Sequence, residues 1–136
     1  MIVYADTSAI LKLVVQEQES ETLAAHLYDA TVSGGHLVAS MLLYTELHCA
    51  ARRRKLPFDL VNDVLAGINL LDVTRSDLMY ASALPRQLRS ADAIHLATAI
   101  RLQADSLVAY DEELLLAAKE SGLMTVSPGA RSLAGA

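Results

Sequence analysis

The chain has 136 residues, of which 53% are hydrophobic and 20% charged, and this composition predicts one globular domain with a sizeable core rather than a disordered, collagen-like or low-complexity chain. Cys49 is the only cysteine, which excludes a disulfide framework and a cysteine zinc site within one chain. Sixteen acidic and eleven basic residues give a net charge of −5, which argues against a simple basic nucleic-acid binder unless several acids converge on a divalent cation.

Short apolar runs alternate along the chain with longer stretches of helical periodicity. Ser40 and Ser90 are good N-caps, and Pro57, Pro85 and Gly122 end helices. The predicted strands cover 2–5, 36–39, 70–73, 107–110 and 124–126. The predicted helices cover 7–15, a stretch around 23–27, the segment from Ser40 to 54, then 58–67, 76–84, 91–103 and 112–120.

Strands that alternate with helices predict a parallel sheet covered on both faces, and right-handed crossovers then favour a three-layer α/β/α sandwich. The sequence predicts a single domain over 1–130 and a loose C-terminal tail over 131–136. In such folds ligands bind beyond the carboxyl ends of the strands, near the point where the strand order reverses. The functional residues are therefore expected at that edge.

Asp6 and Asp111 each directly follow a predicted strand. Taken singly, either is most simply the N-cap of the helix that follows. If the two strands are neighbours, however, both carboxylates emerge at one edge of the sheet. Their matched placement favours a shared site over two independent caps.

Glu46 interrupts the apolar face of the helix that Ser40 is expected to cap. Positions 42, 43, 46, 49 and 50 share that face, and the other four are Leu42, Leu43, Cys49 and Ala50. An unpartnered carboxylate there would cost several kcal/mol or take up a proton. A metal ion or a nearby cation would compensate it, and the alternative is a pair with an arginine at the edge of the core.

Asp92 opens a helix that is apolar on almost every side, which predicts a central, buried helix. Its polar residues Asp92, His95, Thr98 and Arg101 recur every three positions and form one narrow ridge. An acid in the first turn also suits the helix dipole. His95 and Thr98 are interpreted as residues that support the site or the core rather than as metal ligands.

Asp6, Glu46, Asp92 and Asp111 together offer only oxygen donors. Such donors suit Mg²⁺ or Mn²⁺, and the lack of Cys and His pairs argues against zinc. Clustered carboxylates repel one another, so at least one is expected to have a raised pKa without a cation. A divalent ion relieves that repulsion and activates water and phosphoryl groups, which favours phosphodiester hydrolysis.

The segments 4–9, 45–47, 92–99 and 110–111, with Gly122 and Pro128 after them, stand in an order that resembles PIN-domain proteins. The closest resemblance is to the VapC ribonuclease toxins of bacterial toxin–antitoxin pairs. It spans nearly the whole chain, and the segment 92–99 is its most specific part. One departure is Ala109, which stands where many relatives have Thr, so Thr7 or Ser8 would have to supply that hydroxyl.

The resemblance implies a parallel five-stranded PIN fold and a Mg²⁺- or Mn²⁺-dependent endoribonuclease. It implies Asp6 and Asp92 as metal ligands, with Glu46 and Asp111 completing the cluster, and Thr7, Ser8 and His95 supporting them. It also implies an RNA substrate, often tRNA or rRNA, a cognate antitoxin whose C-terminal segment blocks the site, and a homodimer.

Two groups of basic residues are candidates for contact with RNA phosphates. One is the run Arg52, Arg53, Arg54 and Lys55, and the other is Arg86 with Arg89 on the segment leading to Asp92. A solvated helix end explains the run equally well. With five Tyr, one Phe and no Trp, phosphate and shape contacts are expected to outweigh base stacking.

Two other functions fit an acidic site in a chain of this length. A receiver-like domain would need paired acids after the first strand and a lysine after the last, but Thr7 and Ser127 stand there, and Ser8 replaces the second Asp of an aspartate-based phosphatase. A catalytically weak module that only holds an antitoxin-like peptide stays open. The N-terminus lacks a basic signal region and no apolar run approaches about 18 residues, which predicts a cytoplasmic protein without a membrane anchor.

Overall fold

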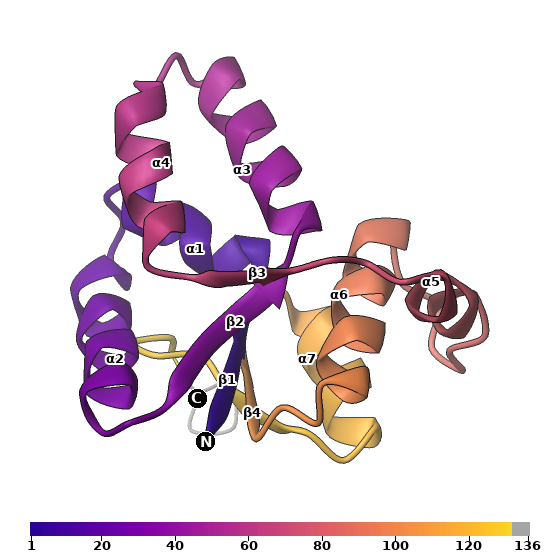
Figure 1. The fold of residues 1–136 in the computed structure, drawn as a ribbon. Helices are drawn as coiled ribbons and strands as arrows, with labels where there is room; N and C mark the ends of the chain where they lie inside the picture. Colours follow the sequence, from indigo (N-terminus) through magenta and orange to yellow (C-terminus); the bar gives the residue numbers. More distant parts are fainter. Residues whose placement is uncertain (132–136) are drawn as a thin grey trace.

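Five parallel strands form the centre of the molecule, in the order β3-β2-β1-β4-β5 (Figure 1). The computed structural model describes residues 1–131. The strands are β1 (Ile2–Ala5), β2 (His36–Ser40), β3 (Asn69–Leu71), β4 (Ser106–Val108) and β5 (Met124–Val126). The parallel, five-stranded sheet predicted from the sequence is confirmed.

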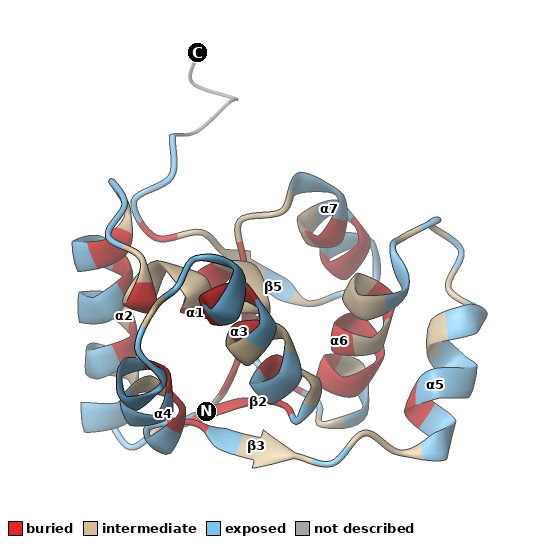
Figure 2. Ribbon diagram, turned by 90° about the horizontal axis from the view of Figure 1, so that it is seen from above, coloured by how far each residue is buried: buried red, intermediate tan, exposed pale blue. Residues whose placement is uncertain are grey.

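Helices cover both faces of this sheet (Figure 2). They are α1 (Thr7–Val14), α2 (Ser20–Val32), α3 (Leu42–Arg53), α4 (Phe58–Ala66), α5 (Arg75–Ser82), α6 (Ser90–Arg101) and α7 (Glu112–Glu120). One core cluster joins α1 to α4 to the sheet, and a second joins α6 and α7 to the other face, with α5 packed outside α6. The three-layer α/β/α sandwich is therefore confirmed.

Strand β1 supplies side chains to both core clusters because successive residues of a strand point to opposite faces. Val3 and Ala5 pack in the cluster with α1 to α4, while Tyr4 packs in the cluster with α6 and α7. Each of these three side chains is at most 2% exposed. This burial on both faces makes β1 the rigid centre of the sheet.

The strand order reverses between β1 and β4. From β1 the chain adds β2 and then β3 on one side, and it returns to place β4 and β5 on the other. Ala5 is in register with Val108, and the amide of Asp6 donates to the carbonyl of Val108 at 3.0 Å. The carboxyl ends of β1 and β4 therefore meet at the edge where the fold places a ligand.

Some boundaries differ from the sequence prediction because side chains take over backbone hydrogen bonds. Strand β4 ends at Val108 rather than at 110, and the amide of Tyr110 donates to Ser8 Oγ at 3.0 Å. Strand β2 includes Ser40, so α3 begins at Leu42, although Ser40 Oγ still accepts from the Leu42 amide at 3.0 Å. The capping interaction of Ser40 is thus present, one residue outside the N-cap position.

Helix α5 begins at Arg75 and ends at Ser82, earlier than the predicted 76–84. Its start is set by a capping box in which Thr74 Oγ1 accepts from the Asp77 amide and Asp77 accepts from the Thr74 amide. This pairing satisfies two amides that the helix itself leaves free.

Within residues 1–131, no helix combines the length and the apolar character that crossing a bilayer requires. Of the tail predicted over 131–136, only Arg131 belongs to the described residues, and 132–136 lie outside them.

Candidate active site

Asp6 lies at the end of β1 and caps α1. Its Oδ2 accepts from the backbone amide of Ser8 at 3.2 Å and from Ser8 Oγ at 2.8 Å. The residue is 2% exposed, and its other oxygen, Oδ1, is buried without a hydrogen-bond partner. The capping role expected for Asp6 is therefore present, but it occupies only one oxygen. The other is a buried acceptor that a cation would satisfy.

Glu46 reaches the same region from α3. Its Oε1 accepts from Thr7 Oγ1 at 2.7 Å and lies 2.6 Å from Nε2 of His95. Burial alone raises the pKa of Glu46, but the hydrogen bonds from His95 and Thr7 outweigh it, so this pKa lies below its ordinary value. The partner that compensates Glu46 is thus a histidine, and the alternative of an arginine pair was wrong.

The buried face of α3 also differs from the predicted one. Leu43, Leu47, Ala50 and Ala51 are buried, whereas Cys49 is exposed. Glu46 therefore flanks the apolar face instead of interrupting it, and its side chain keeps 29% exposure. Partial exposure leaves this carboxylate open to solvent and to a ligand.

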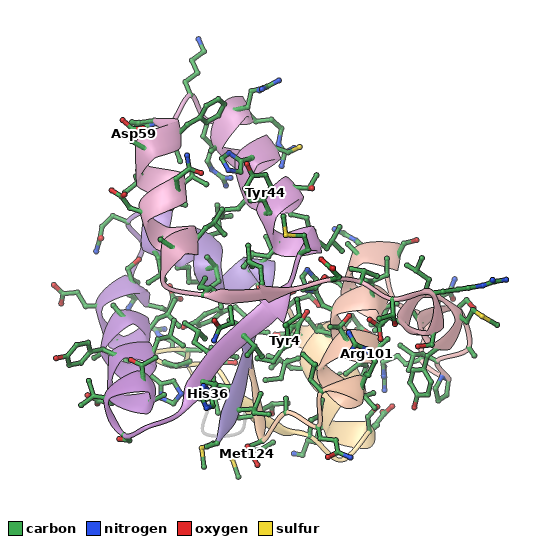
Figure 3. All side chains as sticks on the ribbon, viewed as in Figure 1. Tyr4, His36, Tyr44, Asp59, Arg101 and Met124 are labelled. Atoms are coloured by element: carbon green, nitrogen blue, oxygen red, sulfur yellow. The ribbon has the colours of Figure 1, made fainter. Side chains whose placement is uncertain are left out.

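His95 of α6 lies between the carboxylates of Asp6 and Glu46. It is fully buried, and its Nε2 lies 3.8 Å from Asp6 Oδ1 as well as 2.6 Å from Glu46. Its Nδ1 lies 2.7 Å from the hydroxyl of Tyr4, which is labelled at the centre of Figure 3. Burial lowers the pKa of His95, but the hydrogen bond to Glu46 and the neighbouring carboxylates outweigh it and raise the pKa overall.

Asp92 lies in the first turn of α6, and its pKa reflects the charges of the other acids. Burial, followed by the charges of Asp6 and Asp111, raises its pKa from 3.8 to about 6. The charge of Glu46 acts in the same direction and that of His95 opposes it. A raised pKa was expected for a cluster of carboxylates without a cation, and Asp92 has it.

Asp111 caps α7 through Oδ1, which accepts from the Leu114 amide at 2.9 Å. The sequence prediction placed it directly after a strand, but β4 ends at Val108, so Asp111 stands three residues beyond β4 while Asp6 directly follows β1; the two strands are neighbours. Its charge acts on Asp92, so the fourth predicted acid also faces the common region.

The polar ridge of α6 divides into two parts. His95 faces the acids, whereas Thr98 and Arg101 face Asp77 of α5, with Arg101 Nε donating to Asp77 Oδ1 at 2.7 Å. The side chain of Asp77 is 1% exposed. This second part attaches α5 to α6 and takes no part in the acidic site.

The acids suit a hard divalent cation by their chemistry, but their side chains are turned toward protein partners. Within residues 1–131, no three His, Cys, Asp or Glu side chains are arranged to hold a metal ion as they stand. Oxygens of Asp6, Glu46 and Asp111 accept hydrogen bonds from Ser8, Thr7 and Leu114. The free Oδ1 of Asp6 and the raised pKa of Asp92 are the two features that a cation would relieve.

A family model described as PIN domain matches residues 3–120 of the chain. The chain belongs to the PIN domain family. Membership implies a divalent metal cofactor, and the relatives of this PIN domain are named as ribonucleases. The family predicted from the sequence motifs is thereby confirmed.

Two relatives of this PIN domain in Mycobacterium tuberculosis match over almost their entire length. Ribonuclease VapC47 is 34% identical over 95% of this chain and 98% of the relative, and ribonuclease VapC46 is 36% identical over 93% and 97%. Among solved structures, VapBC2 of Rickettsia felis bound to promoter DNA has a TM-score of 0.75 at 13% identity, covering 93% of this chain and 98% of that one. VapC20 of M. tuberculosis, described as a toxin that cleaves the sarcin-ricin loop, has a TM-score of 0.69 at 16% identity, covering 93% and 99%. At these identities, the structural likeness concerns the fold.

The basic candidates of this PIN domain differ in their surroundings. Arg52, Arg53 and Arg54 are exposed at the end of α3, and the Arg52 guanidinium lies 5.8 Å from the Phe58 ring centre. Arg89 is exposed just before α6. Arg86 instead bridges Glu113 and Glu120 of α7, so it stabilises the protein's own surface.

Sequence reasoning about this PIN domain assigned no role to Tyr4 and gave Ser40 only a capping role. The amide of Ser40 donates to the Tyr4 hydroxyl at 3.0 Å, and that hydroxyl contacts His95. A tyrosine in the middle of a buried apolar strand was the available signal, because a buried hydroxyl needs a polar partner. Thr7 and Ser8 were the candidates to supply the hydroxyl that Ala109 lacks. The Thr7 hydroxyl donates to Glu46, and the Ser8 hydroxyl donates to Asp6.

Proposed function

We propose that this protein is a Mg²⁺- or Mn²⁺-dependent endoribonuclease that acts as the toxin of a toxin–antitoxin pair. The observation that carries the proposal is the convergence of the acids: His95 Nε2 lies 2.6 Å from Glu46 Oε1 and 3.8 Å from the buried, unpartnered Oδ1 of Asp6. Burial, followed by the charges of Asp6 and Asp111, also raises the pKa of Asp92, and Glu46 adds to this. Four carboxylates from distant parts of the chain thus act on one another at the carboxyl edge of the sheet. Without a cation these negative charges repel one another, whereas a bound cation relieves the repulsion and makes the cluster a candidate catalytic site.

Asp6 and Asp92 would hold the cation, with Glu46 and Asp111 completing its surroundings. When bound, a divalent cation polarises the phosphodiester and makes water a stronger nucleophile at neutral pH. The four acids orient the reacting groups by charge, and none of them forms a covalent bond with the phosphoryl group.

The ribonuclease names of the relatives support RNA as the substrate, and VapBC2 supports an antitoxin as the partner. We propose further that the antitoxin covers the acidic edge, that the free toxin is a homodimer and that it acts in the cytoplasm. If the chain is induced in cells, we expect growth arrest that co-expression of a cognate antitoxin, sought in a neighbouring short reading frame, relieves. Light scattering would measure the number of subunits.

Cleavage of RNA by the purified chain tests the activity. With Mg²⁺ or Mn²⁺ present, we expect cleavage that a chelator stops and that Asp6→Asn or Asp92→Asn abolishes without loss of the fold. The exposed Asp63→Asn removes one carboxylate elsewhere and is the matched control. Full activity in both site variants would refute the proposal. Mapping of transcript ends after brief induction in cells would then identify the RNA.

The same variants separate this function from its alternatives. A receiver domain would gain a phosphate from acetyl phosphate on Asp6, which mass spectrometry detects, whereas we expect none. A module that only holds a peptide would bind Mn²⁺ in calorimetry, if at all, without cleaving any RNA.

A further inference from the structure

A continuous line of hydrogen bonds runs beneath the acidic site, from the end of β2 to the carboxylate of Glu46. The Ser40 amide contacts the Tyr4 hydroxyl at 3.0 Å, that hydroxyl contacts His95 Nδ1 at 2.7 Å, and His95 Nε2 contacts Glu46 at 2.6 Å. The Tyr4 and His95 side chains are fully buried. Neither residue can touch an RNA strand, so any role in the reaction has to pass through Glu46.

The donor in each of these hydrogen bonds can be assigned from the groups that are able to donate. An ionised carboxylate only accepts, so the short contact with Glu46 requires a proton on His95 Nε2. A neutral imidazole with that proton has an acceptor at Nδ1, which the Tyr4 hydroxyl fills by donating. The hydroxyl oxygen is then free to accept from the Ser40 amide, which has no other role than donor. Every group in the line is satisfied in this arrangement, and the Thr7 hydroxyl, which lies 3.2 Å from Nε2, donates to Glu46 Oε1 at 2.7 Å.

The opposite tautomer leaves buried groups unsatisfied. With the proton on Nδ1, His95 would donate to Tyr4 and would present a lone pair to the Glu46 carboxylate at 2.6 Å. The Tyr4 hydroxyl would already accept from Ser40 and His95, so its own hydrogen would have no acceptor in this line. Buried donors without acceptors are costly and rare.

Glu46 is consequently held at one oxygen only. Oε1 accepts from His95 and from Thr7 Oγ1, while Oε2 accepts from neither. The same His95 Nε2 lies 3.8 Å from Asp6 Oδ1, so one imidazole stands between the two carboxylates. A glutamate fixed in this way has already lost the side-chain freedom that binding a ligand would otherwise remove.

We propose that Ser40, Tyr4 and His95 form a positioning relay that holds His95 as the Nε2–H tautomer and thereby orients Glu46 toward the cation. The proposal rests on the metal-dependent function above. Tyr4 and His95 are positioning residues in it, and they contact neither the RNA nor the ion.

The tautomer is measurable in the wild-type chain without metal or RNA. A long-range ¹H–¹⁵N correlation spectrum of the metal-free protein, recorded at alkaline pH, is expected to show His95 protonated at Nε2 and unprotonated at Nδ1. A proton on Nδ1, alone or together with one on Nε2, would overturn the relay. This readout involves no variant, so a loss of folding cannot obscure it.

Three variants then test whether the relay acts on the site. His95→Leu removes the donor to Glu46, His95→Gln keeps an N–H group near it, and Tyr4→Phe keeps the ring but removes the hydroxyl. We expect His95→Leu to weaken Mn²⁺ binding in calorimetry by about 10- to 100-fold and His95→Gln by clearly less, as for other groups that orient metal ligands. Tyr4→Phe is expected to give mixed His95 tautomers and an intermediate loss. Unchanged or tighter Mn²⁺ binding in His95→Leu and Tyr4→Phe would refute the proposal.

Kinetics and a matched control separate positioning from general stability. We expect kcat for RNA cleavage to fall in the relay variants while KM for RNA stays within about twofold, because no relay group reaches the RNA. Tyr110→Phe removes another tyrosine hydroxyl, one that donates to the Pro128 carbonyl at 2.6 Å, and should change neither Mn²⁺ affinity nor kcat. If Tyr110→Phe matched the loss in Tyr4→Phe, the relay would be refuted. A wild-type chain that cleaves no RNA would instead contradict the proposed function, whatever the tautomer.

Discussion

At the scale of single residues, Asp92 shows most directly how the site and the stability of the fold oppose each other. Its raised pKa means that the folded chain holds the Asp92 proton more tightly than the unfolded chain does. The folded state is therefore favoured by this residue at low pH, and the advantage is lost as the pH rises through about 6. Above that pH, the fold has to carry a charge that its neighbours repel.

Asp92→Asn is accordingly expected to stabilise the metal-free protein at neutral pH. Because Asp92 is only half-buried and solvent screens part of the repulsion, we expect a gain on the order of 1 kcal/mol in the free energy of unfolding. The gain should shrink as the pH falls from 6 and vanish below 3.8, where the wild-type carboxyl is protonated in both the folded and the unfolded state. Urea unfolding in the presence of a chelator over a pH series measures it. With Asp63→Asn as the control, a wild-type chain more stable than Asp92→Asn at neutral pH would contradict this account.

The acids themselves were predictable from the sequence because their positions follow simple rules. Asp6 directly follows β1, Asp111 is the N-cap of α7, and Asp92 lies in the first turn of a helix with little other polarity. The partner of Glu46 was not predictable, since the choice between an arginine, a metal and His95 depends on which helix packs beside α3. The hydrogen bonds that Tyr4 makes with Ser40 and His95 were not predictable for the same reason, because they connect β1 to β2 and to α6.

At the scale of elements, α5 is attached to the fold by charge more than by apolar packing. Asp77 is its only buried residue, and it pairs with Arg101 of α6. Burial raises the pKa of Asp77, but the hydrogen bonds from Arg101 and Thr74 outweigh it and lower the pKa overall. Asp77 is therefore ionised at neutral pH, and its charge depends on Arg101.

Arg101→Met is expected to destabilise the protein by about 2 to 4 kcal/mol, because it leaves a buried carboxylate without its cation. The loss should exceed that of Arg75→Met, which removes an exposed arginine from the same pair of helices. Adding Asp77→Asn to Arg101→Met should recover part of the stability, since the uncompensated charge is then gone. Urea unfolding and amide exchange in α5 measure both effects. Equal losses for Arg101→Met and Arg75→Met would refute the assignment.

Helix α3 links the acidic site to the basic run at its end. Glu46 and Arg53 are seven residues apart, about two helical turns, so they share one side of α3. Arg52 instead lies against Phe58. Of the predicted phosphate contacts on this helix, Arg53 is thus the one on the same side as the acids.

Arg53→Ala is expected to weaken RNA binding more than Arg52→Ala does. For single-stranded RNA, each lost phosphate contact makes the plot of log binding constant against log salt concentration less steep by about 0.7. Fluorescence anisotropy in an Asp92→Asn background, which is expected not to cleave, measures affinity and slope together. The two arginines carry the same charge on neighbouring positions, so Arg52→Ala controls for net charge. An equal or larger effect of Arg52→Ala would show that RNA takes a different path.

The prediction for α3 also shows what a helical pattern leaves undecided. Two overlapping faces, one with Leu42 and Cys49 and one with Leu47 and Ala51, both satisfy the periodicity of a buried helix. The sequence analysis assigned the first face to the core, yet Cys49 is exposed. Only the packing of α3 against α1 and α4 selects the second face, and that packing is a property of the assembled fold.

At the scale of the whole molecule, alternation of strands and helices was sufficient to predict a parallel sheet with two helical layers. It was not sufficient to predict the strand order, because the sequence does not show on which side of β1 each crossover returns. The observed order places β1 between β2 and β4, and this brings Asp6, Asp92 and Asp111 to one edge. The function thus depends on a topological choice that the residues of the site do not themselves encode.

Convergence of acids in a molecule of net charge −5 makes the fold responsive to divalent cations as a whole. A ligand that binds only the folded state stabilises it in proportion to the logarithm of its concentration, by about 2.7 kcal/mol at 100 times Kd. We therefore expect Mn²⁺ to raise the Tm of the wild-type chain by several degrees and to oppose the destabilisation expected above pH 6. The double variant Asp6→Asn/Asp92→Asn should lose this response in differential scanning calorimetry, while Asp63→Asn keeps it. A full response in the double variant would place the cation on other carboxylates, because charge repulsion at the β1–β4 edge would then have no part in binding it.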